Sequence, residues 1–326
     1  MPDLRSPLSP RHGAAGPRLV ASLFVVILTW GCAGLPEIAA AEHPSDPRPA
    51  GEASGPATGD GAAPASGDLE VVFLDVGQGD AALLRHAEVT VLIDTGRHQA
   101  NDVVPALTAR GVDHLDLLVV THPHADHIGQ FDRVMAAVDV DEVWWSGAVA
   151  TSQTFARAVA ALEDADAAYE EPRAGDTTTI GPLTFEVVGP PVGANLRDLN
   201  NSSLAMRITY GDVRLLFTGD AEAPAESIMV SHHATTLDAE VLNLGHHGSS
   251  TSTTPAFLAA VDPDVAVYSA GAGNSYGHPH AEVLDRLDAA GVATYGTDVH
   301  GAVMVTTDGS DWTVTTERTA PTSARG

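Results

Sequence analysis

Short apolar runs, separated by glycine, aspartate and histidine, dominate the chain from residue 69 onward. Runs of this length bounded by turn-forming residues predict β-strands. In the first half the pattern predicts strands at Leu69–Asp75, Ala81–Leu84, Val89–Ile93, Leu115–Val120 and Val143–Trp145. In the second half it predicts strands at Leu183–Val188, Ser203–Tyr210, Val213–Phe217, Glu240–Leu244, Val265–Ser269, Val303–Thr306 and Trp312–Thr315.

Helical spacing follows several of these strands. A 3.6-residue apolar period predicts helices at 103–110, 128–137 and 152–164, and a further helix after each of the strands that end at Leu244 and Ser269. Asp102 is the predicted N-cap of the first helix. Strands that open each half, with helices interleaved, indicate an α/β protein in which two packed sheets are covered by helices on both outer faces.

The N-terminal segment has a different pattern. A leader containing three arginines precedes the unbroken apolar stretch Leu19–Trp30. That stretch is about a dozen residues long, whereas a membrane-spanning helix needs about 20. Residues 1–32 are therefore predicted to be a secretory signal peptide, with an uncleaved N-terminal anchor as the alternative.

The only cysteine, Cys32, follows this apolar stretch in a segment that resembles the cleavage box of bacterial lipoproteins. Lipidation of Cys32 is favoured over conventional cleavage near residues 39–41. Residues 33–67 are rich in Ala, Pro, Gly and Ser and almost lack large apolar side chains, so they are predicted to be a disordered linker. One folded domain at 68–318 and a disordered tail at 319–326 remain.

The charge of the chain narrows the range of partners. The formal net charge is −27, and all 16 basic residues are arginine. Such a surface repels polyanions over a Debye length of about 10 Å at 0.1 M salt. Tight nucleic-acid binding, which depends on Lys and Arg contacts to phosphate, is therefore disfavoured. Nothing in the sequence indicates a protein partner.

The strongest chemical signal is the segment His122-Pro123-His124-Ala125-Asp126-His127, directly after a predicted strand. Imidazole nitrogens and carboxylate oxygens bind zinc and similar divalent ions at about 2 Å, so the donors must be closely clustered. The spacing offers His122 and His124 to one ion, and Asp126 and His127 to a second.

Further donors follow later strands. Asp220 directly follows the run Leu215–Gly219, and at this strand end its carboxylate could bridge two ions. His246 and His247 follow the predicted strand 240–244, and His278 follows a glycine-rich loop after the next strand. A dinuclear site needs ligands from several segments, and these strand ends supply them.

Together these segments resemble the metallo-β-lactamase fold superfamily and, more narrowly, the metallo-hydrolase domain of ComEC-like competence proteins, here in a stand-alone exported form. The matching segments occur in the family's order between Leu69 and Trp312, and they are FLDVGQGDA (73–81), LIDTG (92–96), THPHADHIG (121–129), NNSSL (200–204), TGD (218–220), GHHGS (245–249) and NSYGHPH (274–280).

The resemblance implies a four-layer αβ/βα sandwich with a site for two divalent ions, Zn²⁺ or Mn²⁺, along one edge of the sheets. The implied metal ligands are His122, His124, Asp126, His127, Asp220 and His278, with His246 competing for the last position. Asp94 and Asp80 are expected to orient the ligands from behind. The family's usual histidine before the bridging aspartate is missing from the segment 200–203, so one ion is expected to bind more weakly.

The implied activity is hydrolysis by a metal-activated water. The leading hypothesis is a phosphodiesterase or nuclease acting on DNA or phosphate esters. In it, Asp126, His246 and His247 take part in catalysis, and the amides of Ser249 and Ser250 hold a phosphate oxygen at a helix N-terminus. The alternatives are a zinc-dependent amide or lactone hydrolase of the β-lactamase type, and a non-catalytic metal-binding lipoprotein that assists DNA uptake. The expected location is extracellular or the cell envelope, with the membrane reached through a lipid on Cys32 or an uncleaved signal.

Overall fold

The computed structural model describes residues 67–319. The predicted signal peptide with Cys32, the linker and the C-terminal tail lie outside the described residues, apart from Gly67 and Thr319. Within 67–319, no helix has both the length and the apolar character that crossing a membrane requires.

The first sheet contains eight strands in the order β17-β16-β1-β2-β3-β5-β7-β8. Its antiparallel part joins β17 to β3, and its parallel part runs from β3 to β8. The strands are β1 Leu69–Phe73, β2 Ala82–His86, β3 Val89–Ile93, β5 Leu117–Val120, β7 Glu142–Trp145, β8 Ala168–Glu170, β16 Val303–Thr307 and β17 Trp312–Thr316.

The second sheet contains seven strands in the order β15-β14-β13-β12-β11-β10-β9. Here β12 to β15 are parallel and β9 to β12 are antiparallel. The strands are β9 Thr177–Ile180, β10 Leu183–Gly189, β11 Ala205–Tyr210, β12 Val213–Phe217, β13 Val241–Asn243, β14 Val265–Tyr268 and β15 Ala293–Gly296. A small separate pair joins β4 His114–Leu115 and β6 Asp139–Val140.

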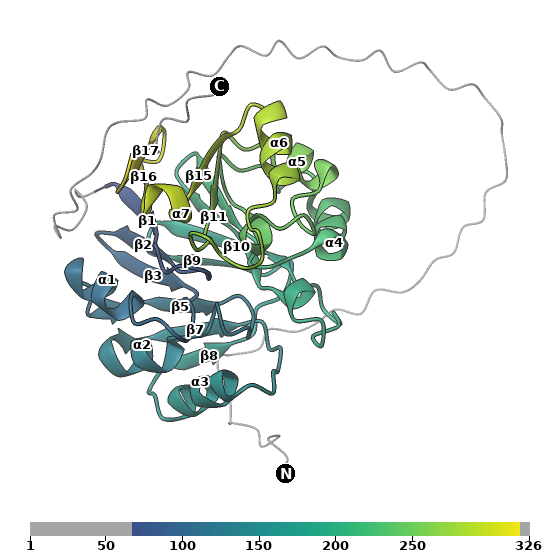
Figure 1. The fold of residues 1–326 in the computed structure, drawn as a ribbon. Helices are drawn as coiled ribbons and strands as arrows, with labels where there is room; N and C mark the ends of the chain where they lie inside the picture. The colour runs from purple at the N-terminus through teal and green to yellow at the C-terminus, as the bar shows by residue number, and fades with distance from the viewer. Residues whose placement is uncertain (1–66, 320–326) are drawn as a thin grey trace, which may run out of the picture. The chain divides into compact units, whose positions relative to one another are not determined.

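Helices cover the outer faces of both sheets (Figure 1). The first sheet is covered by α1 Val103–Ala109, α2 Phe131–Ala137 and α3 Gln153–Glu163, and the second by α4 Ala223–His233, α5 Pro255–Val261 and α6 Ala281–Ala289. A short helix, α7 Thr297–His300, connects β15 to β16. These layers confirm the predicted four-layer αβ/βα sandwich.

Three apolar clusters hold the layers together, one between the sheets and one beneath each set of helices. Phe73 of β1 and Phe217 of β12 stack between the sheets with ring centroids 5.9 Å apart. All four residues of β5 and of β14 are buried because both faces of these parallel strands are covered. This is why the sequence shows them as continuous apolar runs.

The structure corrects several local predictions. Asp102 makes no side-chain cap on α1; instead, the Gln130 side-chain oxygen accepts the N–H groups of Asp102 and Val103, each at 3.2 Å. Helix α2 begins at Phe131 rather than at Ile128, because residues 124–130 form the turns of the His-rich loop. Strands β6, β8, β9 and β15 and helices α4 and α7 were not predicted. The strands are two to four residues long and contain one buried residue between them, α7 has four residues, and α4 has little amphipathic character.

Candidate metal centre

The loop after β5 brings two histidines together. His122 is fully buried, and its Nε2 lies 2.9 Å from Nδ1 of the half-buried His124. Asp220, which follows β12 in the other sheet, places Oδ2 3.5 Å from His122 Nε2. His122, His124 and Asp220 therefore form one group with the spacing of a metal site.

A second group shares Asp220. Its Oδ1 lies 3.2 Å from Nε2 of His127 and 3.8 Å from Nε2 of His247, and both histidines are buried. Asp126, whose side chain is 31% exposed, places Oδ2 3.4 Å from His247 Nε2 and faces the cavity from the loop after β5. Because Asp220 offers one oxygen to each group, its carboxylate is placed to bridge two ions.

Carboxylates behind the rings fix their orientation. Asp94 Oδ2 lies 2.8 Å from Nδ1 of His127, and the same carboxylate accepts the backbone and side-chain bonds of Thr121 at 2.8 and 2.7 Å. Asp80, the fourth donor of the second group, lies 3.9 Å from Nδ1 of His127 and 3.7 Å from Nδ1 of His247, too far for a hydrogen bond. The hydrogen bond of His247 Nδ1 goes to the backbone oxygen of Ser269 at 3.0 Å. Both aspartates thus face the ring nitrogens that point away from Asp220, as partners of metal-bound imidazoles do.

A glycine allows the Asp80 loop to approach the His-rich loop. Asp80 N–H donates to Asp126 O at 3.1 Å, and a Cβ on the neighbouring Gly79 would lie 2.4 Å from that same oxygen. Gly79 also has φ +146°, a conformation that residues with a side chain rarely adopt. Any side chain at position 79 would therefore displace the two loops from one another.

The chemistry of the second group fits a divalent ion. Oδ1 of Asp220 and Nε2 of both His127 and His247 are buried, and although Oδ1 lies 3.2 and 3.8 Å from the two nitrogens, none of the three atoms makes a well-formed hydrogen bond within residues 67–319. Burial alone would raise the pKa of Asp220, but His127, His247 and His122 hold it well below its usual value. Burial alone would lower the pKa of His127, but Asp220 and Asp94 raise it well above its usual value. Such a cluster favours positive charge, which a metal ion supplies in place of protons.

The positions of the later histidines differ from the sequence-based interpretation. The structure places His247, not His278, in the second ligand group. His246 and His247 have φ values of 52° and 57°, and this unusual backbone turns both rings toward Asp220. The His278 ring lies 6.1 Å from that of His247, on the wall of a cavity of about 280 Å³ in front of the two groups.

The predicted phosphate-binding helix N-terminus is corrected by the structure. Helix α5 begins only at Pro255, with Thr254 as its N-cap, so Ser249 and Ser250 do not lie at its first turn. The Ser250 amide instead donates to His280 Nδ1 at 2.8 Å.

Sequence reasoning missed three polar or aromatic residues around this cavity. Asn200, Gln78 and Tyr276 line it, and Tyr276 is 65% exposed with its ring stacked 5.7 Å from that of His278. The Nδ2–H group of Asn200 donates a hydrogen bond to Glu222 Oε1 at 3.3 Å. Its Oδ1 is buried and accepts no hydrogen bond within residues 67–319. The sequence carries no local signal for this position, because Asn200 reaches the wall of the cavity only when the loops of the two sheets come together in the folded chain.

The αβ/βα sandwich, with two ligand groups that share Asp220 at its edge, places this chain in the class of proteins with the metallo-hydrolase fold. The model of the metallo-beta-lactamase superfamily matches residues 74–272. The chain belongs to this superfamily.

Curated relatives include competence protein ComA of Neisseria gonorrhoeae, which is 35% identical over 239 residues that cover 73% of this chain and 32% of that protein. ComE operon protein 3 of Bacillus subtilis is 32% identical over 258 residues, which cover 73% of this chain and 33% of that protein. These relatives confirm the resemblance to ComEC-like proteins, and this chain spans about a third of their length. Among solved structures, the metallo-beta-lactamase fold protein YhfI from Bacillus subtilis is similar, with a TM-score of 0.49 and 14% identity over 74% of this chain and 100% of that one.

Proposed function

We propose that this protein is an exported metal-dependent phosphodiesterase that acts on nucleic acid or a related phosphate ester. The observation that carries the proposal is the sharing of Asp220 between two buried ligand groups, one with His122 and His124 and the other with His127 and His247. Paired sites of this kind suit hydrolysis of phosphate esters, because two ions stabilise both the attacking and the leaving oxygen.

His122, His124 and Asp220 would hold the first ion, and Asp126, His127, His247 and Asp220 the second. Divalent ions such as Zn²⁺ or Mn²⁺, when bound, supply Lewis acidity and lower the pKa of water toward neutrality. Within residues 67–319, the first group has three protein donors. Asn200 Oδ1, buried and unpartnered on the cavity wall, is the further donor that we assign to it.

His246 is the residue that we assign to protonation of the leaving oxygen. Its ring is 22% exposed at the cavity, with Nε2 3.7 Å from Asp220 Oδ2. Its Nδ1 faces Glu222 Oε1 at 3.3 Å and Thr251 Oγ1 at 3.1 Å, which orient the ring. General acids need this combination of access and orientation.

Tyr276 supports a substrate that carries bases. Its exposed ring stands at the mouth of the cavity on the neighbouring His278, and Asn274 Oδ1 accepts the N–H groups of both residues at 3.1 Å. A fixed, exposed aromatic ring is a platform for stacking an unpaired base. The acidic chain favours contact with a few nucleotides over a long duplex, since extended phosphate contacts need many cations.

The names of the competence relatives are consistent with a nucleic-acid substrate and with a location at the cell envelope. The apolar leader supports export, and Cys32 supports lipid anchoring. Metabolic labelling with a palmitate analogue tests the anchor: a Cys32→Ala protein should lose the label.

The function is tested with purified protein loaded with Zn²⁺ or Mn²⁺ and given single-stranded DNA, bis-p-nitrophenyl phosphate or nitrocefin. We expect cleavage of DNA and of the small diester, and loss of at least about 100-fold of kcat in His122→Ala and Asp220→Ala. The exposed His232 provides the control, and His232→Ala should be fully active. Turnover that survives both ligand substitutions would contradict a metal-dependent mechanism, and cleavage of nitrocefin alone would identify an amide hydrolase instead.

A further inference from the structure

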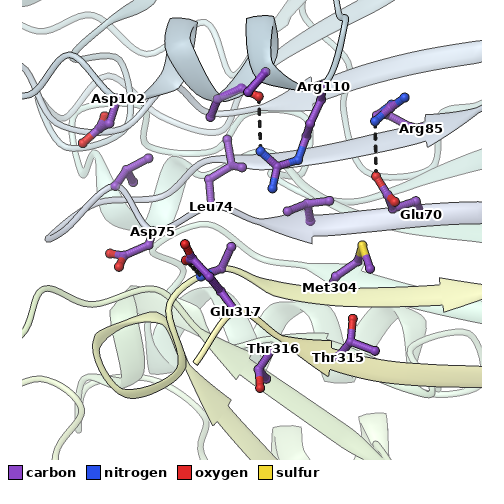
Figure 2. Close-up of a pocket in the computed structure, with 15 residues that line it drawn as sticks. Glu70, Leu74, Asp75, Arg85, Asp102, Arg110, Met304, Thr315, Thr316 and Glu317 are labelled. Atoms are coloured by element: carbon purple, nitrogen blue, oxygen red, sulfur yellow. Dashed lines mark hydrogen bonds and ion pairs between the residues drawn. The ribbon is translucent and has the colours of Figure 1, made fainter. Parts of the chain in front are cut away.

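A larger cavity lies away from the metal centre, on the outer face of the first sheet beside α1 (Figure 2). We call it the outer cavity; it has a volume of about 540 Å³ and is lined by residues of β1, β2, β16, β17 and α1. Val72, Leu74 and Met304 form its apolar part. This volume is in the range of small-molecule sites, which lie at about 300–1,000 Å³.

Almost every carboxylate at the outer cavity already has a partner. Glu70 pairs with Arg85 at 3.5 Å, and Asp75 pairs with Arg318 at 3.0 Å. Asp102 Oδ1 accepts the side-chain amide of Gln130 at 2.5 Å. Glu317 Oε2 likewise accepts the backbone N–H of Ala302 at 3.0 Å. The negative groups of the lining are therefore engaged in holding the fold.

Arg110 is the exception among the charged residues of this lining. It extends from the end of α1 toward β1, beside the Arg85–Glu70 pair (Figure 2). Its one side-chain hydrogen bond within residues 67–319 goes from Nη1 to Ala106 O at 3.2 Å, which leaves most of the five guanidinium donors available. Burial lowers the pKa of Arg110, Glu70 and Glu317 raise it, and Arg85 lowers it; the net shift is downward. An acidic group beside this guanidinium would offset that cost.

An unpartnered hydroxyl adds a second polar group. Oγ1 of Thr315, on β17, is buried and has no hydrogen-bond partner among residues 67–319, and Thr315 lines the same cavity. Buried polar atoms without a partner are uncommon in folded proteins, and a bound molecule is one way to satisfy them.

From this arrangement we propose that the outer cavity binds a small organic anion, whose carboxylate or phosphate group pairs with Arg110 and whose apolar body lies against Val72, Leu74 and Met304. A planar guanidinium with free donors binds carboxylate and phosphate in two-point fashion. The many carboxylates around it exclude a polyanion. The site is independent of the metal centre and of the proposed function.

The test is calorimetric titration of the full chain with benzoate, phenyl phosphate, inorganic phosphate and benzyl alcohol. The first two probes distinguish a carboxylate from a phosphate head, and the last two separate the head from the apolar body. Protein treated with EDTA is titrated in parallel, so that phosphate bound at the metal centre is recognised. We expect at least one of the two aromatic acids to bind, more tightly than either inorganic phosphate or benzyl alcohol.

Arg110→Gln should weaken that binding at least tenfold, whereas Arg197→Gln, which removes an exposed arginine outside the cavity, should not change it. Thr315→Val should weaken it severalfold without lowering the melting temperature, since it removes a buried hydroxyl that has no partner. If Arg110→Gln does not fold, Thr315→Val tests the proposal in its place. Equal binding by the wild type and the folded variants would overturn the proposal. The proposal would also be overturned if neither benzoate nor phenyl phosphate bound at concentrations up to about 50 mM, because ligands of this size with low binding energy per atom still bind below that concentration.

Discussion

Oδ2 of Asp94 lies 2.8 Å from Nδ1 of His127, so a carboxylate directly after β3 orients a ring in the loop that follows β5. We predict that Asp94→Asn lowers metal affinity by about 10- to 100-fold, because the amide has no negative charge and only one acceptor oxygen to share between Thr121 and the His127 ring. Calorimetric titration with Zn²⁺ measures the change, and Asp288→Asn on the exposed face of α6 is the matched control. Unchanged affinity in Asp94→Asn would mean that the negative charge of Asp94 is not needed to hold His127.

Asn200 is predicted to affect one ion and not the other. Its Oδ1 is unpartnered on the cavity wall, so Asn200→Ala should weaken one of two metal-binding steps by about tenfold, the cost of losing one good polar contact. Asn195→Ala, on an exposed part of the same loop, should leave both steps unchanged. Equal weakening of both steps would indicate a general disturbance of the loop.

Tyr276 is predicted to contribute to substrate binding more than to turnover. Base stacking on an aromatic ring contributes about 1–3 kcal/mol, so Tyr276→Ala should raise KM for single-stranded DNA about tenfold, with kcat nearly unchanged. Tyr276→Phe should behave as the wild type, and bis-p-nitrophenyl phosphate, which has no base, should be cut equally by all three proteins. A parallel loss on the small diester would assign Tyr276 to the integrity of the loop.

His114 provides a pH dependence away from the metal centre. Its Nε2 lies 3.1 Å from Asp141 Oδ1, and the hydrogen bond with Asp141 raises the pKa of His114. A raised pKa in the folded state means that the pair stabilises the protein below the unfolded-state pKa of about 6.5, and that this contribution is lost as pH rises through the folded value. Because the pair is exposed, we expect less than about 1 kcal/mol. Titration of the His114 ring by NMR should show a lower pKa in Asp141→Asn than in the wild type. Urea unfolding should show a smaller difference in the free energy of unfolding between these two proteins at pH 8 than at pH 5.5.

The contact between the two sheets is predicted to dominate stability. Phe217 is 2% exposed and stacks on Phe73, so Phe217→Ala should lower the free energy of unfolding by about 3–5 kcal/mol. Val149 is 71% exposed, and Val149→Ala should stay within about 0.5 kcal/mol of the wild type. Chemical unfolding followed by circular dichroism measures both values.

The sequence predicted those metal-ligand candidates that lie close together in the chain or directly follow a clear strand. The segment His122–His127 carries its ligand spacing within six residues, and Asp220 follows an apolar strand directly. The central strands were equally clear, because buried parallel strands are continuous apolar runs.

The choice between His247 and His278 was not local. It depends on the left-handed backbone at residues 246 and 247, which turns adjacent rings to one side, and no hydrophobic period reports this. Gln130 as the cap of α1, Asn200 on the cavity wall and Arg110 in the outer cavity depend in the same way on segments that meet only after folding.

The two ligand groups draw on both sheets, with the histidines at 122, 124 and 127 from one and Asp220 and His247 from the other. Neither half of the chain holds a complete set of donors. An ion bound there would connect the two halves of the chain, and its binding energy would stabilise the whole domain against unfolding. Under the proposed function, removal of the metal would therefore both abolish activity and make the domain easier for proteases to cleave.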